Sequence, residues 1–318
     1  IKRDGHSNVI SYRTGVSHEY KHIQNVSIRS SVYGIGFNSN VSSAGGWTDK
    51  NAINYGLRSA IYTKIPISNE INIGGVSGIE VQQQVAQVQG YSMKQSPFDS
   101  ASTWVYGVNP YWVINAATSN IYATSTNNHL FTEWTLNLPH DFSLLAGLGA
   151  SNMHLNLNDR FNTALITRPS TFDTSYINMI SPHFAINKVI NKQVSFYASY
   201  TTGFKAPTSS YFYITTPAIT KPPTPATGSL NSLLSPEKGV QFEIGSKGQL
   251  AGGTFTYELA FFNTVFSQKM TAIAVVSPAA PNTTLYSYVV NGGKQVHNGI
   301  EALLKYNVYA SNSNFISS

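Results

Sequence analysis

The stretch SFYASYTTGFKAPTSSYFY (residues 195–213) begins as a β-strand and ceases to be one halfway along. Over 195–202, the apolar positions Phe196, Ala198 and Tyr200 alternate strictly with more polar ones, which is typical of a strand with one apolar face. Gly203 and Pro207 then break the alternation, and a cluster of aromatic residues follows. The stretch therefore predicts a strand that runs into a long loop rich in aromatic rings.

The same alternation recurs along the whole chain, and helical periodicity is nearly absent. Strands are predicted at 9–20, 26–38, 53–65, 70–82, 128–138, 141–155, 174–187, 193–202, 236–250, 254–267 and 285–308, with a twelfth beginning at Asn314. Most are longer than the roughly five or six residues of a typical globular strand. They are long enough for the roughly 9 to 11 residues with which a tilted barrel strand crosses a bilayer, so the lengths favour a membrane barrel over a sandwich.

The predicted connections alternate in length. Short ones are expected at 21–25, 66–69, 139–140, 187–192 and 251–253, and long ones at 39–52, 83–127, 156–173, 203–235 and 267–284. Outer-membrane barrels have short periplasmic turns and long extracellular loops. Charges alternate as well: on 254–266, Phe255, Leu259 and Phe261 share one face, and Glu258 lies on the other. A lipid-facing charge at the bilayer midplane costs about 2–4 kcal/mol, although a soluble sheet with one wet face gives the same alternation.

Composition narrows the choice of protein class. Of the 318 residues, 11% are charged, against roughly 25% in an average soluble domain. There is no cysteine, which excludes disulfides and cysteine-ligated metals. The net charge of +6 comes from scattered residues, which argues against nucleic acid as a partner. The first residues, IKRDGHSNVI, have neither an initiator Met nor a signal-peptide core, as expected of a chain entered in the middle.

Three motifs carry a family resemblance: YASYTTGFKAPT (197–208), LSPEKGVQFEIGSKG (234–248) and YVVNGGKQVHNGIEALLKY (288–306). Together they resemble the barrel of TonB-dependent outer-membrane receptors, in which a Gly-Phe-Arg/Lys-Ala-Pro element, a Leu-x-Pro-Glu strand start and a later Asn-x-Gly occur in this order. The motif positions here are Gly203, Phe204, Lys205, Ala206, Pro207, Pro236, Gly245, Asn291 and Gly299. The resemblance covers roughly the last 140 residues closely and the upstream part more loosely.

The resemblance implies an all-β fold, an antiparallel transmembrane β-barrel with about 11–12 of a probable 22 strands present. Residues 1–318 are then expected to be one partial barrel with no plug domain and no complete closure. It also implies active import, with energy from the TonB complex, of a scarce ligand across the outer membrane of a Gram-negative bacterium. A ferric siderophore is the first expectation, and haem, cobalamin and oligosaccharide are the other ligand classes. The expected partners are outer-membrane lipid, the iron chelate or similar ligand, and a plug domain and TonB reached through the missing N-terminal region.

Two groups of residues are candidates for a site. Aromatic residues of predicted extracellular loops are candidates for ligand contact, with the aromatic girdle or a small loop core as the other interpretations: Trp104, Tyr106, Tyr111, Trp112, Tyr211, Phe212 and Tyr213. Charged residues on the polar strand faces are expected to face the lumen and to be available to a plug, with ordinary solvation in the lumen as the other interpretation: Glu237, Glu243, Lys247, Glu258, Glu301 and Lys305.

Other functions have less support. The sequence contains no G-x-S-x-G elbow and no H-E-x-x-H helix. His18 and His22 would lie about 13 Å apart on a strand, too far to share a metal ion. We therefore expect no catalytic residue, metal site or cofactor. A passive porin shares the alternation but would lack the GFKAP and LSPE elements. A soluble β-sandwich adhesin would need no detergent to stay in solution.

Overall fold

The computed structural model describes residues 7–43, 46–95, 112–161, 169–216, 219–220, 223–224, 227–277 and 280–306. Nearly all of them form one antiparallel sheet of 11 strands. In spatial order these strands are β1 (Ser7–Ile23), β2 (Val26–Ser43), β3 (Gly46–Pro66), β4 (Asn72–Gln95), β5 (Trp112–Leu138), β6 (Phe142–Asp159), β7 (Thr171–Ile190), β8 (Val194–Lys205), β13 (Glu237–Leu250), β14 (Phe255–Ser277) and β15 (Ala280–Tyr306). The all-β, antiparallel prediction is confirmed. The predicted strand at Asn314 lies outside the described residues.

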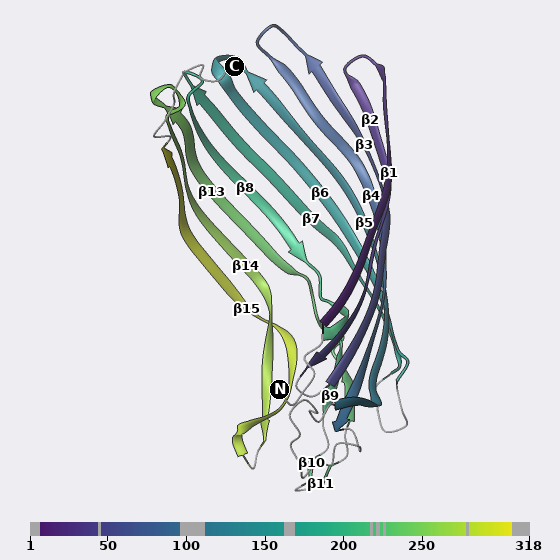
Figure 1. Cartoon of the computed structure of the whole chain (residues 1–318). Coiled ribbons are helices and arrows are strands. Elements are labelled where there is room, and N and C mark those ends of the chain that lie inside the picture. Colours follow the sequence, from purple (N-terminus) through teal and green to yellow (C-terminus); the bar gives the residue numbers. More distant parts are fainter. Residues whose placement is uncertain are drawn as a thin grey trace, which may run out of the picture.

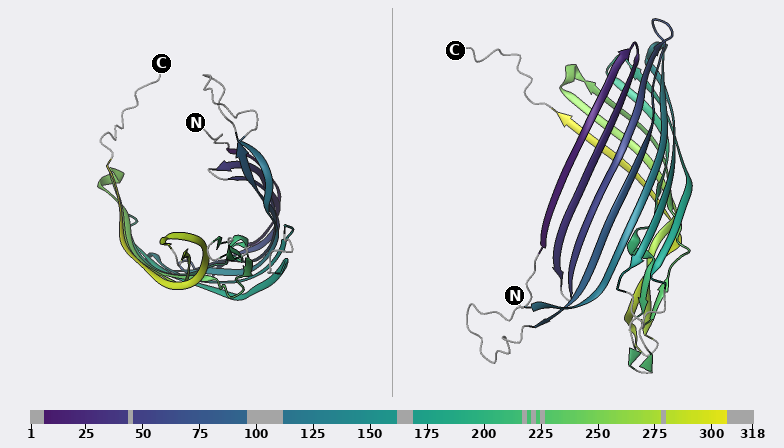
Figure 2. Two further views of the ribbon diagram at one scale, coloured as in Figure 1. Left: turned by 90° about the horizontal axis from the view of Figure 1, so that it is seen from below. Right: turned by 90° about the vertical axis from the view of Figure 1, so that its right-hand side faces the viewer.

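The sheet bends into a cylinder wall that is open along one side. Tilted strands run side by side in Figure 1, and the view along the axis in Figure 2 shows the wall as an arc. β1 and β15 are the two edges of the sheet and do not pair with each other. Among the described residues, no helix has the length and apolar character that crossing a bilayer requires.

The five short connections lie at one end of the wall, as predicted. They are the turn at 24–25, the segment 67–71, η2 (Pro139–Asp141), the turn at 191–193 and η4 (Ala251–Gly253). Asn25, His140, Asn191 and Lys192 have positive φ values. Asn and, to a lesser degree, His are among the residues that adopt this left-handed conformation more often than most. These turns reverse the chain within a few residues and fix the antiparallel register of each hairpin.

The strands are longer than predicted on the side of the long connections. For the described parts of 39–52, 83–127, 156–173 and 267–284, the prediction of loops is wrong, because paired strand occupies most of each described part. In β2 to β6, Asn, Gln, Ser and Thr occupy many positions on both faces of these extensions, so no apolar alternation marks them in the sequence. The backbone nevertheless stays paired, for example between Asn51 and Gln87 and between Gln87 and Tyr122.

One predicted long loop remains, between β8 and β13. It contains η3 (Ser209–Tyr211) and two small hairpins, one formed by β9 (Tyr213–Thr216) with β12 (Thr227–Leu230) and the other by β10 (Ile219–Thr220) with β11 (Pro223–Thr224). We call residues 206–236 the inserted loop. Its start folds back against the wall at the end opposite the short turns (Figure 1).

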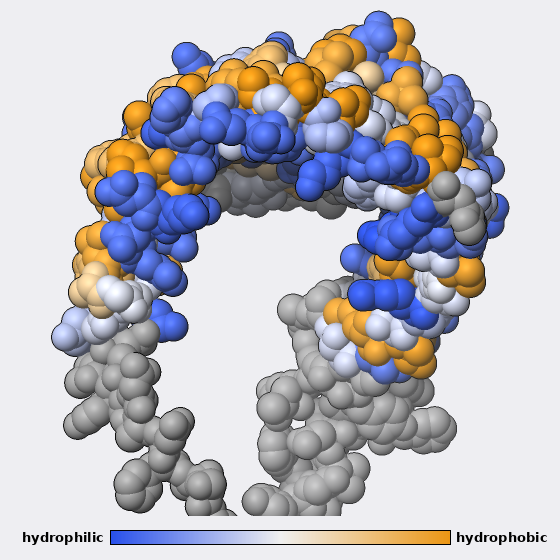
Figure 3. All heavy atoms as spheres, turned by 90° about the horizontal axis from the view of Figure 1, so that it is seen from above, coloured by the Kyte–Doolittle hydropathy of each residue, from blue (hydrophilic) through white to orange (hydrophobic). Residues whose placement is uncertain are grey.

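The two faces of the wall differ in polarity. Seen along the axis, hydrophilic residues line the hollow and hydrophobic residues cover much of the convex face (Figure 3). On β5, the apolar convex positions lie within 130–138, which is about the length that a barrel strand needs to cross hydrocarbon. Thr126 and Asn128 continue this face away from the short turns. We call the apolar convex surface near the short turns the outer band.

Glycine lies directly opposite an aromatic residue of the neighbouring strand at several points of the wall. The ring then crosses the space that a glycine side chain would fill: a Cβ on Gly245 would lie 2.6 Å from the Tyr197 ring. Six such pairs are Tyr12–Gly36, Tyr33–Gly56, Trp134–Gly75, Phe131–Gly78, Tyr197–Gly245 and Phe262–Gly299. Glycine here is needed for the close approach of a ring.

Candidate functional site

A polar cavity lies on the concave face of β8, β13, β14 and β15. Its volume is about 610 Å³, and its lining includes Glu243, Lys247, Glu258 and Glu301. These four side chains belong to the alternating set on the concave face, and Lys247 lies directly opposite Glu258. The wall therefore offers a group of carboxylates and one nearby ammonium to anything that occupies the hollow.

Tyr197 positions the Glu243 carboxylate in this cavity. Its hydroxyl donates to Oε1 of Glu243 over 2.7 Å, while the Gln241 amide donates to Oε2 of the same carboxylate over 3.0 Å. The ring can reach Glu243 because Gly245 leaves room for it. Lys305 lies on the same face of β15, opposite Thr256. Five of the six charged candidates thus share the concave face, and their contact with a plug stays a prediction.

Glu237 is the exception among the charged candidates. Its side chain is only 4% exposed and forms ion pairs with Lys205, at 3.7 Å, and with Lys269, at 3.4 Å. Its Oε1 also accepts a 2.6 Å hydrogen bond from the backbone N–H of Met270. The carboxylate is thus enclosed at the strand end, where it ties β8, β13 and β14 together and leaves little surface for a plug.

Asn291 makes a second set of contacts at this place. Its Oδ1 accepts from the Ser235 N–H over 2.7 Å, and its Nδ2 donates to the carbonyls of Ser235, over 2.9 Å, and Gln268, over 2.7 Å. Gln268 has a positive φ and lies where the register of β14 and β15 shifts. The three sequence motifs therefore meet in space: Lys205 comes from the first, Ser235 and Glu237 from the second, and Asn291 from the third. We call these four residues the clamp.

The remaining motif residues have structural surroundings. Pro207 is fully buried at the start of the inserted loop, and Pro236 is half-buried at its end. Phe204 lies opposite Lys238, whose ammonium is 5.9 Å from the ring centroid. Gly299 is covered by the Phe262 ring, and Gly203 has open space around it. Ala206 follows β8 directly.

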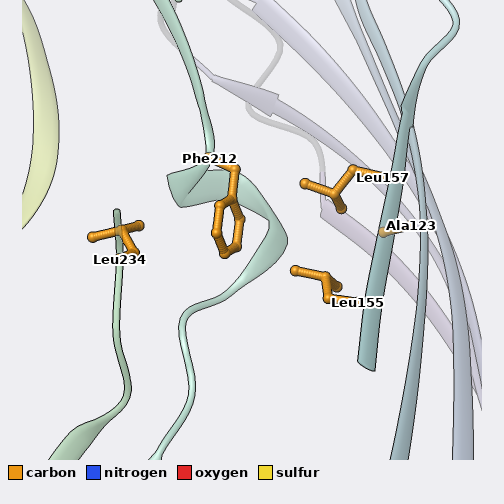
Figure 4. Packing of buried hydrophobic residues seen from close by; sticks show 5 residues of the cluster. All are labelled: Ala123, Leu155, Leu157, Phe212 and Leu234. Carbon is orange, nitrogen blue, oxygen red and sulfur yellow. The ribbon is translucent and has the colours of Figure 1, made fainter. Parts of the chain in front are cut away.

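The inserted loop carries a small hydrophobic core of its own. Phe212 is fully buried and packs with Leu234 against Ala123, Leu155 and Leu157 of the wall (Figure 4). The Phe172 ring, on β7, lies 5.2 Å from the Phe212 ring. In this arrangement Phe212, one of the predicted ligand residues, has no exposed surface for a ligand.

Two neighbouring tyrosines keep part of their surface exposed. Tyr211 and Tyr213 are half-buried at the edge of this core, and the Tyr213 hydroxyl donates to the Ser170 carbonyl over 2.9 Å. Tyr176, on the part of β7 beyond the outer band, donates to the Leu234 carbonyl over 2.9 Å, and burial raises the pKa of its phenol. Ligand contact by Tyr211 and Tyr213 stays a prediction.

The other aromatic candidates cannot be placed against this core. Trp104, Tyr106 and Tyr111 lie outside the described residues, and Trp112 is the first residue of β5. Within the described ranges, no cluster of three or more His, Asp or Glu side chains could hold a metal ion.

A second polar group on the concave wall was missed in the sequence. Glu80 accepts a 2.7 Å hydrogen bond from the Tyr33 hydroxyl and lies 3.6 Å from Arg58, and Glu133 lies 3.2 Å from His183. Alternation marks Glu133 as facing away from the apolar side, but no pattern within one strand shows which residue lies opposite. Charged side chains thus line the hollow from β3 to β15.

Comparison with known proteins supports this geometry. The sequence matches the family profile described as "TonB dependent receptor-like, beta-barrel" over residues 2–317. No curated protein matches it.

Solved structures with a similar fold include three receptors. The ferric-catecholate import receptor Fiu from K12 E. coli is 15% identical with a TM-score of 0.64, and the alignment covers 96% of this chain and 46% of Fiu. The siderophore receptor PiuA from Acinetobacter baumannii is 14% identical with a TM-score of 0.69 (96% and 45% covered), and the Serratia marcescens hemophore receptor HasR is 15% identical with a TM-score of 0.66 (96% and 47% covered). The chain spans less than half the length of each receptor, and at these identities the likeness concerns the fold alone.

Proposed function

Since the chain belongs to the TonB-dependent receptor family, over the β-barrel part of that family, we propose that it forms part of an outer-membrane receptor that imports a scarce ligand with energy from TonB. The observation that carries the proposal is the wall itself, with a polar concave face, an apolar outer band and an inserted loop clamped at the end opposite the short turns. A ferric siderophore is the proposed ligand. Fiu and PiuA are described as siderophore or ferric-chelate receptors, and HasR as a hemophore receptor.

The open arc supports a proposal about assembly. Eleven strands are half of a 22-stranded barrel, the size in which outer-membrane transporters carry a plugged lumen. A membrane-spanning sheet cannot leave its edges facing lipid, because unpaired backbone groups there cost several kcal/mol each. We therefore propose that β1 and β15 pair with further strands of the complete receptor, and that the cavity carboxylates Glu243, Glu258 and Glu301 face its plug.

Iron uptake by intact cells tests the proposal. Cells with and without the full gene are starved of iron and given radioactive iron as a catecholate chelate, as ferric citrate or as haem. Energised import predicts that deletion lowers the uptake of one of these probes, and that collapsing the proton-motive force in cells with the gene lowers it to the same level. Diffusion through a porin would continue after the collapse. Persistent gene-dependent uptake in such cells would favour the passive-channel alternative.

A further inference from the structure

A groove of about 600 Å³ runs over the outer band across β4 to β8 and β13. Its shape follows from small residues between large ones. Ala146 on β6 lies directly between Trp134 on β5 and Phe184 on β7. The two rings stand on either side of the alanine, and Trp134 and Phe184 are 36% and 52% exposed.

The next row of the groove repeats this arrangement. Ala198 on β8 lies directly between Ile186 on β7 and Ile244 on β13. The two alanines thus form low points between flanking large side chains. The groove is therefore an apolar depression with a repeated arrangement of side chains, and it offers room for an acyl chain lying along the wall.

A cation lies beyond the end of the groove nearest the short turns. Lys188 follows Ile186 on the same convex face and lies directly between Phe142 and Phe196 of the neighbouring strands. Its ammonium is 4.3 Å from the centroid of the Phe142 ring, and it donates a hydrogen bond to the His140 carbonyl in η2. A lysine on an apolar surface extends its aliphatic stem along that surface and keeps its charge at the polar boundary.

We propose that this surface binds one phospholipid of the periplasmic leaflet, with an acyl chain in the groove and the anionic phosphate at Lys188. The proposal rests on the proposed function, which places the outer band in a membrane. Charge complementarity selects the occupant, because the phosphate of a phospholipid lies at the boundary of the hydrocarbon, where the ammonium lies. A lipid of the opposite leaflet would have its head group at the far edge of the band. Basic side chains near a membrane surface attract anionic lipids.

Native mass spectrometry of the full-length receptor tests the charge. The protein is extracted in mild detergent and titrated with palmitoyl-oleoyl phosphatidylglycerol. Lys188→Gln is compared with Lys192→Gln, which removes an equal charge from the turn at 191–193. We expect Lys188→Gln to lower the fraction carrying one lipid at least fivefold and Lys192→Gln to change it less than twofold. Equal binding by the two variants would overturn the proposal.

A second pair of variants tests the groove. Ala146→Leu fills its floor, whereas Ala302→Leu adds the same volume to the convex face of β15, away from the groove. The first substitution should reduce lipid retention severalfold and the second should not. If the receptor is a dimer and Ala146→Leu dissociates it, the groove binds a second copy of the receptor, and the proposal of a lipid site is overturned.

The outcomes separate this inference from the proposed function. Lipid retention is measured on purified protein without any iron chelate, whereas import is measured in cells. If the receptor inserts into the membrane and imports its ligand, but all variants bind lipid equally, only the proposal of the lipid site is wrong. A protein absent from the outer membrane defeats both proposals.

Discussion

Asn291 on β15 and Ser235 at the end of the inserted loop, 56 residues apart in the chain, exchange two hydrogen bonds. The amide of Asn291 thus takes the place of a paired backbone, accepting from the N–H of Ser235 and donating to its carbonyl. This contact gives a structural reason for the presence of both motifs in one chain, because the asparagine of the third motif binds the serine of the LSPE element.

Removing this amide should loosen the inserted loop. Asn291→Ala leaves the half-buried N–H and carbonyl of Ser235, and the exposed carbonyl of Gln268, without this partner. A buried group left unsatisfied costs about 1–3 kcal/mol, so the two Ser235 groups should account for most of the loss. We expect faster cleavage of 206–236 by protease in detergent and a lower unfolding temperature. Asn298→Ala is the control, because that side chain makes an exposed hydrogen bond to Asn263. Equal cleavage rates in the two variants would contradict the role of Asn291.

Neutralising Glu237 should lower the free energy of unfolding. Glu237→Gln keeps the shape of the side chain but removes the charge that pairs with Lys205 and Lys269. We expect a loss of about 1–3 kcal/mol, the range for hydrogen bonds to charged groups and for buried groups left unsatisfied. Denaturant unfolding of the refolded receptor measures it. Glu258→Gln is the matched control, because Glu258 is exposed on the concave wall; if both variants unfold alike, the clamp does not depend on this charge.

Filling the space at Gly245 should displace Tyr197. In Gly245→Val the new side chain would overlap the ring and break its 2.7 Å hydrogen bond to Glu243, and overpacking typically costs about 1–3 kcal/mol. Gly203→Ala serves as the control, because a methyl group at that position would have no other atom within 4 Å. Combining Gly245→Val with Tyr197→Ser should restore part of the stability. An unfolding midpoint of Gly245→Val equal to that of Gly203→Ala would refute the packing argument.

The loop aromatics should separate into structural and ligand-contacting residues. Phe212→Ala should destabilise the loop core by about 3–5 kcal/mol, as is usual for a buried phenylalanine. Tyr211→Ala should leave protease resistance nearly intact, because Tyr211 is half-buried at the edge of that core. If Tyr211 contacts the ligand, its variant should still lower the affinity for the imported iron chelate, measured by quenching of receptor fluorescence. Unchanged affinity would remove Tyr211 from the ligand site.

The part of the fold that carries the outer band was predictable from the sequence, and its extension was not. Between Leu130 and Leu138 every second residue faces the outer band, so the alternation identifies the strand. Beyond Asn128 that face becomes polar, although the backbone stays paired up to the start of β5. Alternating polarity in a sequence arises where the two faces of a strand have different surroundings. A strand whose two faces are both polar shows no such alternation, although it is equally well paired.

The site was predictable only in part, for a related reason. Which face Glu243 and Lys247 occupy follows from alternation along one strand. The burial of Glu237 does not, because it depends on Lys269 and Met270 of the neighbouring strand and on a register shift at Gln268. The order of the motifs along the chain gave no sign that Asn291 would bind Ser235. Contacts of this kind are set by pairing between strands, which a single sequence does not display.

Under the proposed function, the polar strand extensions beyond the outer band face the outside of the cell. Over β2 to β6 the wall continues as hydrogen-bonded sheet past its apolar part. A large molecule approaching from that side therefore meets a shaped surface assembled from several strands, in which neighbouring side chains come from distant parts of the sequence. An antibody raised against the folded wall would bind this composite surface. A synthetic peptide with the sequence of residues 80–95 would present only one strand of it. An immunogen aimed at this region needs to preserve the sheet.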